Sequence, residues 1–556
     1  MLNMQQSRDG GQMPAISVAD LIVRRLQEAG VHAVFGVPGG GSTLDVIESA
    51  GQIGLPFVLT ATETAAAIAA IAQAEISGRL AACLTTLGPG VASVVNGVAC
   101  AKLERAPLIV LTDTHPTGGG TFEHQRVDHH ALLAPITKWS ATIAPADASR
   151  LVDQAIACAL SDPPGPVHLE CPADVSLQPA QDRGAGSADT VPVFAMPRRD
   201  NSSWSSVGPD NARLEHLVTT ARTPLLLVGL GVRRPADATA IRALCERRRV
   251  PAMVTYRAKG VIGDADPHFA GVFTNGSIEV PIVDQADLLI GIGLDPIELI
   301  PRPWKHVQPV IYCGSWPVAA GHVPFAAQII ADVPRAVGEL SDRLRPSSWD
   351  LDEVARLVRQ QRAAVCPSSE SMAAHDVVRQ LAGVAAGATR VTVDAGAHMF
   401  PATALWPVDE PNQMLISNGL STMGFALPAA IGAASLDRGT PVVALTGDGG
   451  LLMCAGELLT ASRENLRVIT VVFNDGSLSL IDVKQRQRRY AVSGVMLGAV
   501  AWASMAESVR MAAHVATNAR ELTHAIELAL DHPGPSLIDV RVSPSTYAET
   551  LRAIRG

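Results

Sequence analysis

The chain has 556 residues, a formal net charge of −9, 47% hydrophobic residues and only 17% charged residues. This length is typical of about two to four domains, and the apolar content allows large buried cores. The two densest basic groups, 247–249 and 486–489, are typical of an exposed helix surface, so we expect no nucleic-acid partner. The low charge content is typical either of an Ala-rich protein or of a surface that is largely buried between subunits, and we favour the second interpretation.

Cysteine usage and the N-terminus indicate the compartment. The eight cysteines lie mostly in apolar runs and show no metal-ligand spacing, which is typical of buried thiols in a reducing environment. The first residues, MLNMQQSRDGGQM, contain no apolar signal core, and no run of about 18 apolar residues occurs. We therefore expect a cytoplasmic protein with no membrane partner.

The first part of the chain alternates helical patterns with short apolar strands. The strand candidates are HAVFGVPG, PFVLT, LAACLTT, APLIVLTD and GPVHLECPADV. Strands that alternate with helices predict a parallel sheet covered on both faces. We assign this unit to residues 14–180. Residues 177–209 are polar and irregular, which predicts a linker.

Two further units repeat this alternation. Residues 208–342 contain the strand candidates PLLLVGLG, VPAMVTY, ADLLIGIGLD and PVIYCG. A second connection precedes residues 372–546, which contain RVTVDAGA, PVVALTGDGG, LRVITVVFND and PSLIDVRV. The sequence therefore predicts an α/β protein of three doubly wound parallel-sheet domains.

The third unit carries a ligand-binding pattern. Gly447 and Gly449 flank Asp448 at the end of a buried strand, and a helix is expected to begin near Gly450. Glycines allow a tight turn and a close backbone approach, and the following helix N-terminus favours phosphate. After 24 residues the next strand ends in Asn474 and Asp475. Oxygen ligands from adjacent strand ends, together with a diphosphate, would complete a Mg²⁺ shell. An ordinary turn with a capping aspartate is the alternative.

This pattern, Gly-Asp-Gly followed by an Asn pair, resembles the signature of thiamine-diphosphate-dependent enzymes. The resemblance implies that Mg²⁺ is held by Asp448, by the side chain of Asp475 and by the backbone carbonyl of Ser477. The family usually has Asn where this chain has Asp475. If the register slips by one residue, Asn474 and Gly476 take these roles.

The first unit resembles the pyrimidine-binding domain of the same family, most closely that of acetolactate-synthase-like enzymes. The resemblance covers VHAVFGVPGG, TATETAAAIAA, TTLGPG and APITKW. It implies that Glu63 hydrogen-bonds a ring nitrogen of the aminopyrimidine and so promotes removal of the thiazolium proton. Ala-rich neighbours favour a carboxyl that keeps its proton, although a helix N-terminal Glu is the alternative. Thr62 replaces a histidine that relatives often have before this Glu.

The same resemblance assigns the remaining site residues. Gln125 aligns with a glutamine that faces the substrate, and His124 lies beside it. The segment DAGAHMF would wrap the diphosphate with Ala395, Gly396, Ala397 and His398, while Gly447, Gly449 and Gly450 form the turn. Met423 would wedge between the two cofactor rings, and Ser421 would offer its carbonyl to the pyrimidine amine. We expect no metal at His124, His129 and His130, because their spacing fits no ligand pattern.

The middle unit has a partial dinucleotide-type glycine pattern at Gly229 and Gly231. The resembling acetolactate synthases hold FAD here through an Arg-Phe-Asp-Asp-Arg-like run, whereas this chain has GIGLDPIELIPRPW. We therefore predict a domain without FAD.

The resemblance implies a thiamine-diphosphate-dependent lyase or carboligase that acts on a 2-oxo acid or 2-hydroxyketone. The alternatives are a 2-oxo acid decarboxylase, a 2-hydroxyacyl-CoA lyase and a cofactor-binding homologue without turnover. In resembling enzymes the two halves of the active site come from different subunits, so we expect a homodimer at least, and a homotetramer from paired dimers.

Overall fold

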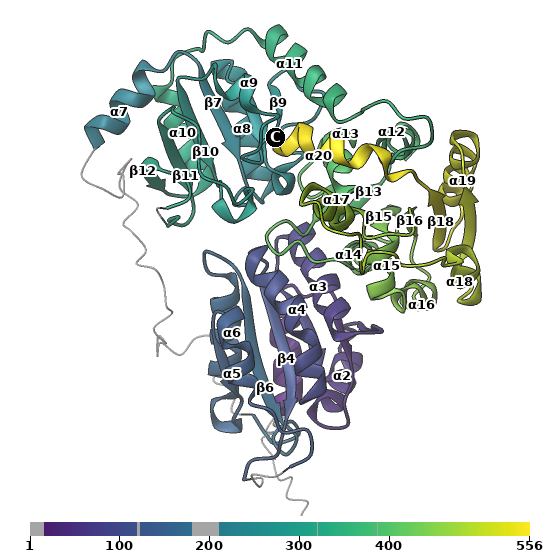
Figure 1. Cartoon of the computed structure of the whole chain (residues 1–556). Helices are drawn as coiled ribbons and strands as arrows, with labels where there is room; N and C mark the ends of the chain where they lie inside the picture. The colour runs from purple at the N-terminus through teal and green to yellow at the C-terminus, as the bar shows by residue number, and fades with distance from the viewer. Residues whose placement is uncertain (1–15, 119–122, 181–210, 320, 386) are drawn as a thin grey trace, which may run out of the picture.

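The computed structural model describes residues 16–118, 123–180, 211–319, 321–385 and 387–556. Its named strands form three six-stranded sheets in which every strand pair is parallel. Figure 1 shows the first unit below, the middle unit at upper left and the third unit at upper right. The predicted α/β class with three parallel-sheet units is therefore confirmed. The unit boundaries stay predictions, and most of the predicted linker lies outside the described residues.

The first sheet has the order β2-β1-β3-β4-β6-β5. Its strands are β1 (Val34–Val37), β2 (Phe57–Leu59), β3 (Ala81–Thr85), β4 (Leu108–Thr114), β5 (Ser140–Thr142) and β6 (Pro166–Pro172). Its helices are α1 (Val18–Glu28), α2 (Ser42–Gln52), α3 (Glu63–Ser77), α4 (Pro89–Leu103), α5 (His129–Leu133) and α6 (Ala148–Leu160).

The middle sheet has the order β12-β11-β10-β7-β8-β9. Its strands are β7 (Pro224–Val228), β8 (Ala252–Val254), β9 (Phe269–Val272), β10 (Leu288–Ile292), β11 (Val310–Gly314) and β12 (Phe325–Ile330). Its helices are α7 (Asn211–Thr220), α8 (Pro235–Arg248), α9 (Val280–Val283) and α10 (Val333–Arg343), and α11 (Leu351–Ala364) leads to the third unit.

The third sheet, β14-β13-β15-β16-β18-β17, repeats the order of the first sheet. Its strands are β13 (Arg390–Val393), β14 (Met414–Ile416), β15 (Val442–Gly447), β16 (Val468–Asn474), β17 (Ala512–Ala516) and β18 (Ser536–Arg541). Its helices are α12 (Ala374–Ala385), α13 (Met399–Leu405), α14 (Ala426–Leu436), α15 (Asp448–Cys454), α16 (Glu457–Arg463), α17 (Ser479–Gln487), α18 (Trp502–Ser508), α19 (Ala519–Asp531) and α20 (Tyr547–Arg555).

The first and third units share a hydrophobic core. Helix α3 contains seven alanines and packs against α14, which contains five. Small side chains let the two backbones approach closely: a Cβ at Gly432 of α14 would lie 2.1 Å from the carbonyl oxygen of Ala69. One continuous cluster of buried residues includes both helices. The Ala-rich helix that follows Glu63 is therefore buried within the chain itself, which removes one reason for assigning it to a subunit interface.

All eight cysteines are free thiols, and six of them are buried. Burial raises the pKa of these buried thiols, for example that of Cys83 to about 12, so they remain protonated near neutral pH.

Candidate active site

The Gly-Asp-Gly turn lies at the carboxyl end of the third sheet. Strand β15 ends at Gly447, and α15 begins at Asp448, two residues earlier than expected, because Gly447 already serves as the extended N-cap. The two carboxylate oxygens of Asp448 accept hydrogen bonds from the backbone N–H groups of Gly449 (2.8 Å) and Gly476 (2.7 Å). The turn is thus tied to the end of the neighbouring strand β16.

The residues after β16 divide into two environments. Asn474 is buried, and its amide donates to Asp539 at 2.8 Å. Asp475 instead accepts from the N–H of Ser477 at 3.0 Å and lies close enough to Asp448 for the two charges to interact. Asp475 therefore faces the Gly-Asp-Gly turn, whereas Asn474 is engaged elsewhere.

The two aspartates are electrostatically strained as a pair. Burial raises the pKa of Asp448 above its usual range. Burial, followed by the negative charge of Asp448, raises the pKa of Asp475 to about 6. A divalent cation between them would offset both effects, and carboxylate oxygens suit Mg²⁺. Among the described residues no group of three or more His, Cys, Asp or Glu side chains forms a metal site by itself. Two carboxylates completed by a diphosphate fit this observation.

His398 lies beside the same turn. Its ring stacks on Phe473 of β16, with centroids 4.9 Å apart and an interplanar angle of 19°. A Cβ at Gly396 would lie 2.7 Å from this ring, so only glycine fits there. Burial lowers the pKa of His398 to about 4, and its buried Nε2 has no hydrogen-bond partner among the described residues. A buried polar nitrogen without a partner is costly. The negative charge of a bound diphosphate would favour protonation of this ring, and its Nε2–H would then donate to a diphosphate oxygen.

The segments 395–397 and 421–423 are joined by Asp394, which sequence reasoning did not single out. Its carboxylate accepts from the N–H groups of Ala395 and Gly424 and from the hydroxyl of Thr446. A Cβ at Gly450 would lie 2.5 Å from the same carboxylate. The acid at the end of strand RVTV was the signal available in the sequence.

The two residues predicted to contact the pyrimidine, Ser421 and Met423, lie just before Gly424, whose N–H Asp394 binds. The terminal methyl group of Met423 lies 3.5 Å from where a Cβ of Gly449 would be. Ser421 has a positive φ of 54°, which few L-residues adopt, and its hydroxyl donates to the carbonyl of Asn418. The structure thus brings Met423 to the Gly-Asp-Gly turn and holds Ser421 in a constrained backbone.

Glu63 is the first residue of α3, and Thr62 is its N-cap, accepting a hydrogen bond from the N–H of Ala65. The carboxylate of Glu457, a fully buried residue that sequence reasoning also missed, accepts from the N–H groups of Ala61 and Thr62. The loop before Glu63 is therefore fixed to the start of α16, the second helix after the Gly-Asp-Gly turn.

The loop TTLGPG joins the two catalytic candidates of the first unit. A Cβ at Gly90 would lie 3.3 Å from a carboxylate oxygen of Glu63, and one at Gly88 would lie 2.4 Å from the carbonyl oxygen of Gln125. Gln125 itself is exposed and has a positive φ of 63°. The structure thus places both residues against one loop.

Two of the neighbouring histidines contact Glu170. His129 is buried, accepts from the N–H of Gly88 at 3.0 Å through Nε2, and contacts Glu170 at 2.8 Å through Nδ1. His130 contacts the other oxygen of Glu170 at 3.0 Å, while His124 is exposed. These contacts give His129 the role of holding the loop against Gln125.

The two groups of residues remain separate within one chain. Among the described residues no hydrogen bond or ion pair joins Glu63 to Asp448 or Asp475; the contacts of these aspartates lie within the third unit.

Comparison with known proteins decides the family. Models of the thiamine pyrophosphate enzyme N-terminal TPP binding domain, central domain and C-terminal TPP binding domain match residues 16–132, 212–340 and 394–540. The acetolactate synthase of Mycobacterium bovis is 30% identical over 483 residues, which cover 83% of this chain and 76% of that protein. The chain belongs to the thiamine pyrophosphate enzyme family.

Other relatives of this thiamine pyrophosphate enzyme match along nearly the whole chain. Acetolactate synthase of Bacillus subtilis is 28% identical over 559 residues, covering 96% of this chain and 94% of that protein. The large subunit of acetolactate synthase isozyme 1 of Escherichia coli is also 28% identical, over 94% of this chain and 93% of its own length. The resemblance to thiamine-diphosphate-dependent enzymes of acetolactate-synthase type is therefore confirmed. No helix in the described parts of the chain is long and apolar enough to cross a membrane.

Proposed function

We propose that the protein is a Mg²⁺- and thiamine-diphosphate-dependent enzyme that joins or cleaves carbon–carbon bonds next to the carbonyl of a 2-oxo acid or 2-hydroxyketone. The observation that carries the proposal is the pair Asp448 and Asp475 beside the partnerless Nε2 of His398. A cation and an anionic group would satisfy these three side chains together.

The third unit would hold the cofactor by its diphosphate. Asp448, Asp475 and the carbonyl of Ser477 are the proposed Mg²⁺ ligands, and residues 395–398 and 447–450 surround the diphosphate. Asp475 is preferred over Asn474 because the amide of Asn474 is occupied by Asp539. Met423 and Ser421 would contact the rings.

Thiamine diphosphate, when bound, supplies a carbon nucleophile that adds to a substrate carbonyl. Glu63 would hold a proton at the pyrimidine ring, and Gln125 would orient the substrate from the opposite side of the TTLGPG loop. Glu457 supports this arrangement because it fixes the backbone immediately before Glu63.

The relatives favour carboligation. The three relatives described above bear the name acetolactate synthase, and two of them match along more than nine-tenths of their length. This favours the carboligase over a simple decarboxylase or an acyl-CoA lyase, and the presence of Glu63 argues against a homologue without turnover. Mass spectrometry of products formed from a panel of 2-oxo acids would separate a hydroxyketone from an aldehyde.

Substitution of Glu63 tests the proposed chemistry. Glu63→Gln keeps the size of the side chain but removes the acid, so thiamine diphosphate should remain bound. Proton exchange at its thiazolium carbon should slow about 10²–10⁴-fold, the scale of a lost acid–base contribution. Exchange is followed by NMR in deuterated buffer with saturating Mg²⁺ and thiamine diphosphate.

Calorimetry on the same variant is the control for this experiment. If the affinity for thiamine diphosphate is normal and exchange is also unchanged, Glu63 is only a helix-terminal residue and its assignment is wrong.

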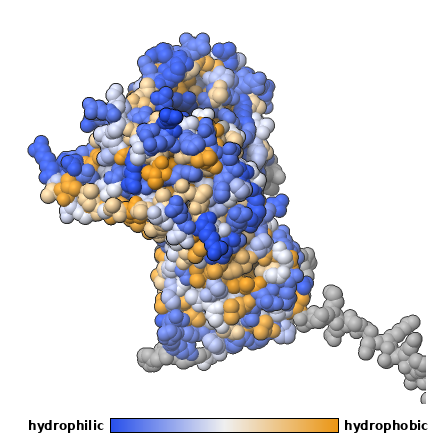
Figure 2. All heavy atoms as spheres, turned by 90° about the vertical axis from the view of Figure 1, so that its right-hand side faces the viewer, coloured by the Kyte–Doolittle hydropathy of each residue, from blue (hydrophilic) through white to orange (hydrophobic). Residues whose placement is uncertain are grey.

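The proposed assembly is a homodimer, with a homotetramer formed by two dimers. Large apolar side chains remain exposed near the loop before Glu63 and on the two helices after the Gly-Asp-Gly turn: Leu59 (39%), Leu452 (41%), Met453 (60%) and Leu459 (51%). Figure 2 shows apolar patches on the side of the molecule that faces right in Figure 1. A second copy covering such a surface would bring Glu63 of one chain to Asp448 of the other.

Mixing two inactive variants tests this assembly. Refolding Glu63→Gln chains together with Asp448→Ala chains should restore part of the activity, because one of the two hybrid sites contains both intact residues. Heterodimers proven by mass spectrometry that remain inactive, or an active monomer in light scattering, would contradict the shared site.

We also propose that the middle domain holds no FAD. Its strand order is that of a dinucleotide-binding sheet, whose ligand crevice opens where the order reverses, between β7 and β10. Here the two loops touch: the N–H of Gly231 donates to Gly293 at 2.8 Å. The carboxylate of Glu298 accepts from the N–H of Leu230 at 2.7 Å and from the hydroxyl of Thr255 at 2.5 Å. A protein carboxylate thus occupies a backbone N–H that would otherwise be available to a phosphate.

The remaining assignments follow the sequence. We propose residues 14–180 as the pyrimidine-binding domain, 208–342 as the middle domain and 372–546 as the diphosphate-binding domain. The eight free cysteines support a reducing, cytoplasmic location.

A further inference from the structure

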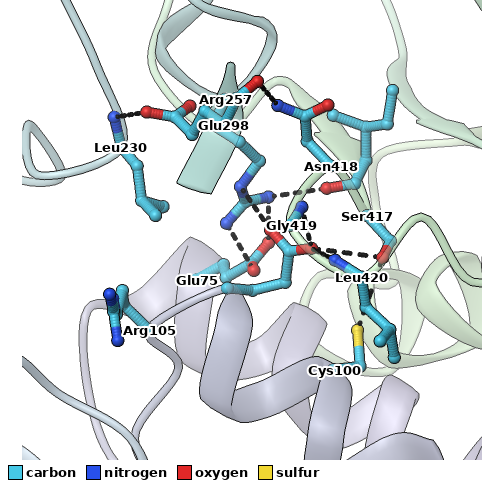
Figure 3. Close-up of polar contacts among 12 residues, drawn as sticks. Glu75, Cys100, Arg105, Leu230, Arg257, Glu298, Ser417, Asn418, Gly419 and Leu420 are labelled. Atoms are coloured by element: carbon cyan, nitrogen blue, oxygen red, sulfur yellow. Dashed lines mark hydrogen bonds and ion pairs between the residues drawn. The ribbon is translucent and has the colours of Figure 1, made fainter. Parts of the chain in front are cut away.

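A buried ionic cluster lies where the three units meet (Figure 3). Arg257 of the middle unit reaches between Glu75 of α3 and Glu104, the C-cap residue of α4. Its guanidinium contacts Glu75 through two N–O pairs of 2.5 and 2.8 Å and Glu104 at 3.4 Å. The side chains of all three residues are at most 5% exposed. Buried charges require partners, and each acid here obtains one from Arg257.

The two acids differ in their second contacts. Among the described residues the hydrogen-bond and ion-pair partner of Glu75 is Arg257, and the charge of Arg233 also acts on both acids. The Oε1 atom of Glu104 accepts hydrogen bonds from the third unit: from the hydroxyl of Ser417 (3.1 Å), from the N–H of Gly419 (2.9 Å) and from the N–H of Leu420 (3.4 Å). Glu104 therefore binds a backbone loop as well as a cation. Ser417, Gly419 and Leu420 of this loop are labelled in Figure 3.

This loop, residues 417–422, leads directly to Met423. Besides hydrogen bonds within the loop, other units hold it: Asn418 donates to the carbonyl of Glu298 at 2.8 Å, and Asn96 of α4 donates to the hydroxyl of Thr422 at 2.9 Å. Within it, Ser421 has a φ of 54°, a conformation that costs an L-residue free energy and persists only where the surroundings impose it.

The approach of the loop to α4 is close. A Cβ at Gly419 would lie 2.9 Å from the carbonyl oxygen of Leu103, so glycine is needed to bring the N–H of Gly419 to Glu104. The carboxylate is well suited to this task, because it accepts several N–H and O–H donors at once, and charge-assisted hydrogen bonds are stronger than neutral ones.

We propose that Glu104 is a positioning residue for cofactor binding: its carboxylate sets the conformation of loop 417–422 and so presents Ser421 and Met423 to the aminopyrimidine end of thiamine diphosphate. The inference rests on the proposed function, since it assumes that these two residues contact the pyrimidine. Arg257 and Glu75 hold Glu104 in place. Arg257 also donates to the carbonyl of Ile416 at 3.2 Å, directly before the loop, but of the three side chains only that of Glu104 accepts from residues 417–420.

Glu104→Gln and Glu75→Gln form a matched pair of variants. Each removes one buried acid from Arg257, so both should lower the stability of the domain junction. Only Glu104→Gln also weakens the contacts to Ser417, Gly419 and Leu420. The difference between the two variants therefore isolates the effect on the loop from the effect on domain packing.

The first measurement needs no cofactor. Hydrogen–deuterium exchange of the apo-protein, read by mass spectrometry, should show faster exchange of the peptide that contains the amides of Gly419 and Leu420 in Glu104→Gln than in Glu75→Gln. Equal exchange of this peptide in both variants would overturn the proposal, because Glu104 would then act only in domain packing.

The second measurement separates the two ends of the cofactor. Calorimetry with Mg²⁺ should show a thiamine diphosphate affinity reduced about 10–100-fold in Glu104→Gln, the scale of a lost hydrogen bond to a charged group. Inorganic pyrophosphate, which reaches only the diphosphate site, should bind as it does to the wild type. An equal loss for both ligands, or an unchanged affinity for thiamine diphosphate, would overturn the proposal.

Two further observations keep the outcomes distinct. If wild-type protein binds no thiamine diphosphate, the proposed function fails, while the exchange experiment still tests whether Glu104 holds the loop. If Glu104→Gln does not fold, Ser417→Ala removes one contact of the same carboxylate and leaves Arg257 untouched. Ser417→Ala should show the same changes at smaller size, and normal exchange and affinity in that variant would contradict the proposal.

Discussion

The carboxyl ends of the third and middle sheets present polar groups in opposite states. In the third sheet Asp448 and Asp475 repel each other across adjacent strand ends, and a buried histidine nitrogen has no partner. In the middle sheet the acid at the corresponding edge, Glu298, is satisfied by the N–H of Leu230 and the hydroxyl of Thr255. A cation and an anion would balance the aspartate pair and the histidine of the third edge, the open edge, whereas the loops of the middle edge, the closed edge, are hydrogen-bonded to each other.

Removing one acid from each edge should give the largest contrast. Asp448→Ala should reduce the affinity for thiamine diphosphate with Mg²⁺ by more than about 100-fold, because the diphosphate loses a metal ligand and its charge is left uncompensated. Glu298→Gln, a matched change of a buried acid at the closed edge, keeps the backbone carbonyl that accepts from Asn418 and should leave this affinity within about threefold. Titration calorimetry measures both.

Neighbouring variants define the open edge further. Asp475→Ala should lose affinity as Asp448→Ala does, while Asn474→Ala should lose less, because Asn474 supports Asp539 rather than the metal. Normal affinity in Asp448→Ala, or a larger loss in Asn474→Ala than in Asp475→Ala, would refute the assigned ligands.

The contribution of the closed edge to the stability of the folded protein should depend on pH. Burial raises the pKa of Glu298 to about 8, against the opposing hydrogen bonds from Thr255 and Leu230. Between the ordinary value of 4.5 and about 8 the folded state binds more protons than the unfolded state, so stability falls as pH rises. Between pH 6 and pH 8 ionisation of Glu298 should lower the free energy of unfolding of the wild type by about 2 kcal/mol. This decrease should be absent in Glu298→Gln.

Urea unfolding at the two pH values measures this difference. Glu246→Gln, an exposed position on α8 of the same unit, is the control and should follow the wild type. Parallel pH dependence in the wild type and Glu298→Gln would show that Glu298 is already ionised in the folded protein.

Buried strands inside the sheets were easier to predict from the sequence than strands at the sheet margins. Every strand predicted from a fully apolar run was found, such as β15 and β16, whose burial is nearly complete. The strands that were missed are short or lie at sheet margins. Examples are β5 (SAT) and β17 (AAHVA), which are half exposed and lack a β-branched apolar run. Edge strands bury too little surface to impose such a pattern.

Some residues of the candidate site could likewise be predicted from the sequence, and others could not. The turn at Asp448 could be predicted because its glycines and acid are adjacent in sequence and the chemistry needs them there. Glu104, Glu298 and Glu457 could not, because each of them binds at least one backbone N–H group far away in the chain, as Glu104 binds that of Gly419. A backbone donor leaves no residue type in the sequence that would mark the contact.

The smallest expected effect concerns flavin. If the middle edge is closed, the purified protein should carry no yellow absorbance, and added FAD should leave its melting temperature unchanged. A ligand that binds the folded state must raise that temperature. At a concentration a hundredfold above its dissociation constant it increases the free energy of unfolding by about 2.7 kcal/mol. Added thiamine diphosphate with Mg²⁺ is the positive control in the same experiment and should raise it. Stoichiometric FAD released on denaturation would mean that the contacts between Gly231 and Gly293 and between Glu298 and Leu230 open in solution. The comparison between an open and a closed edge would then fail.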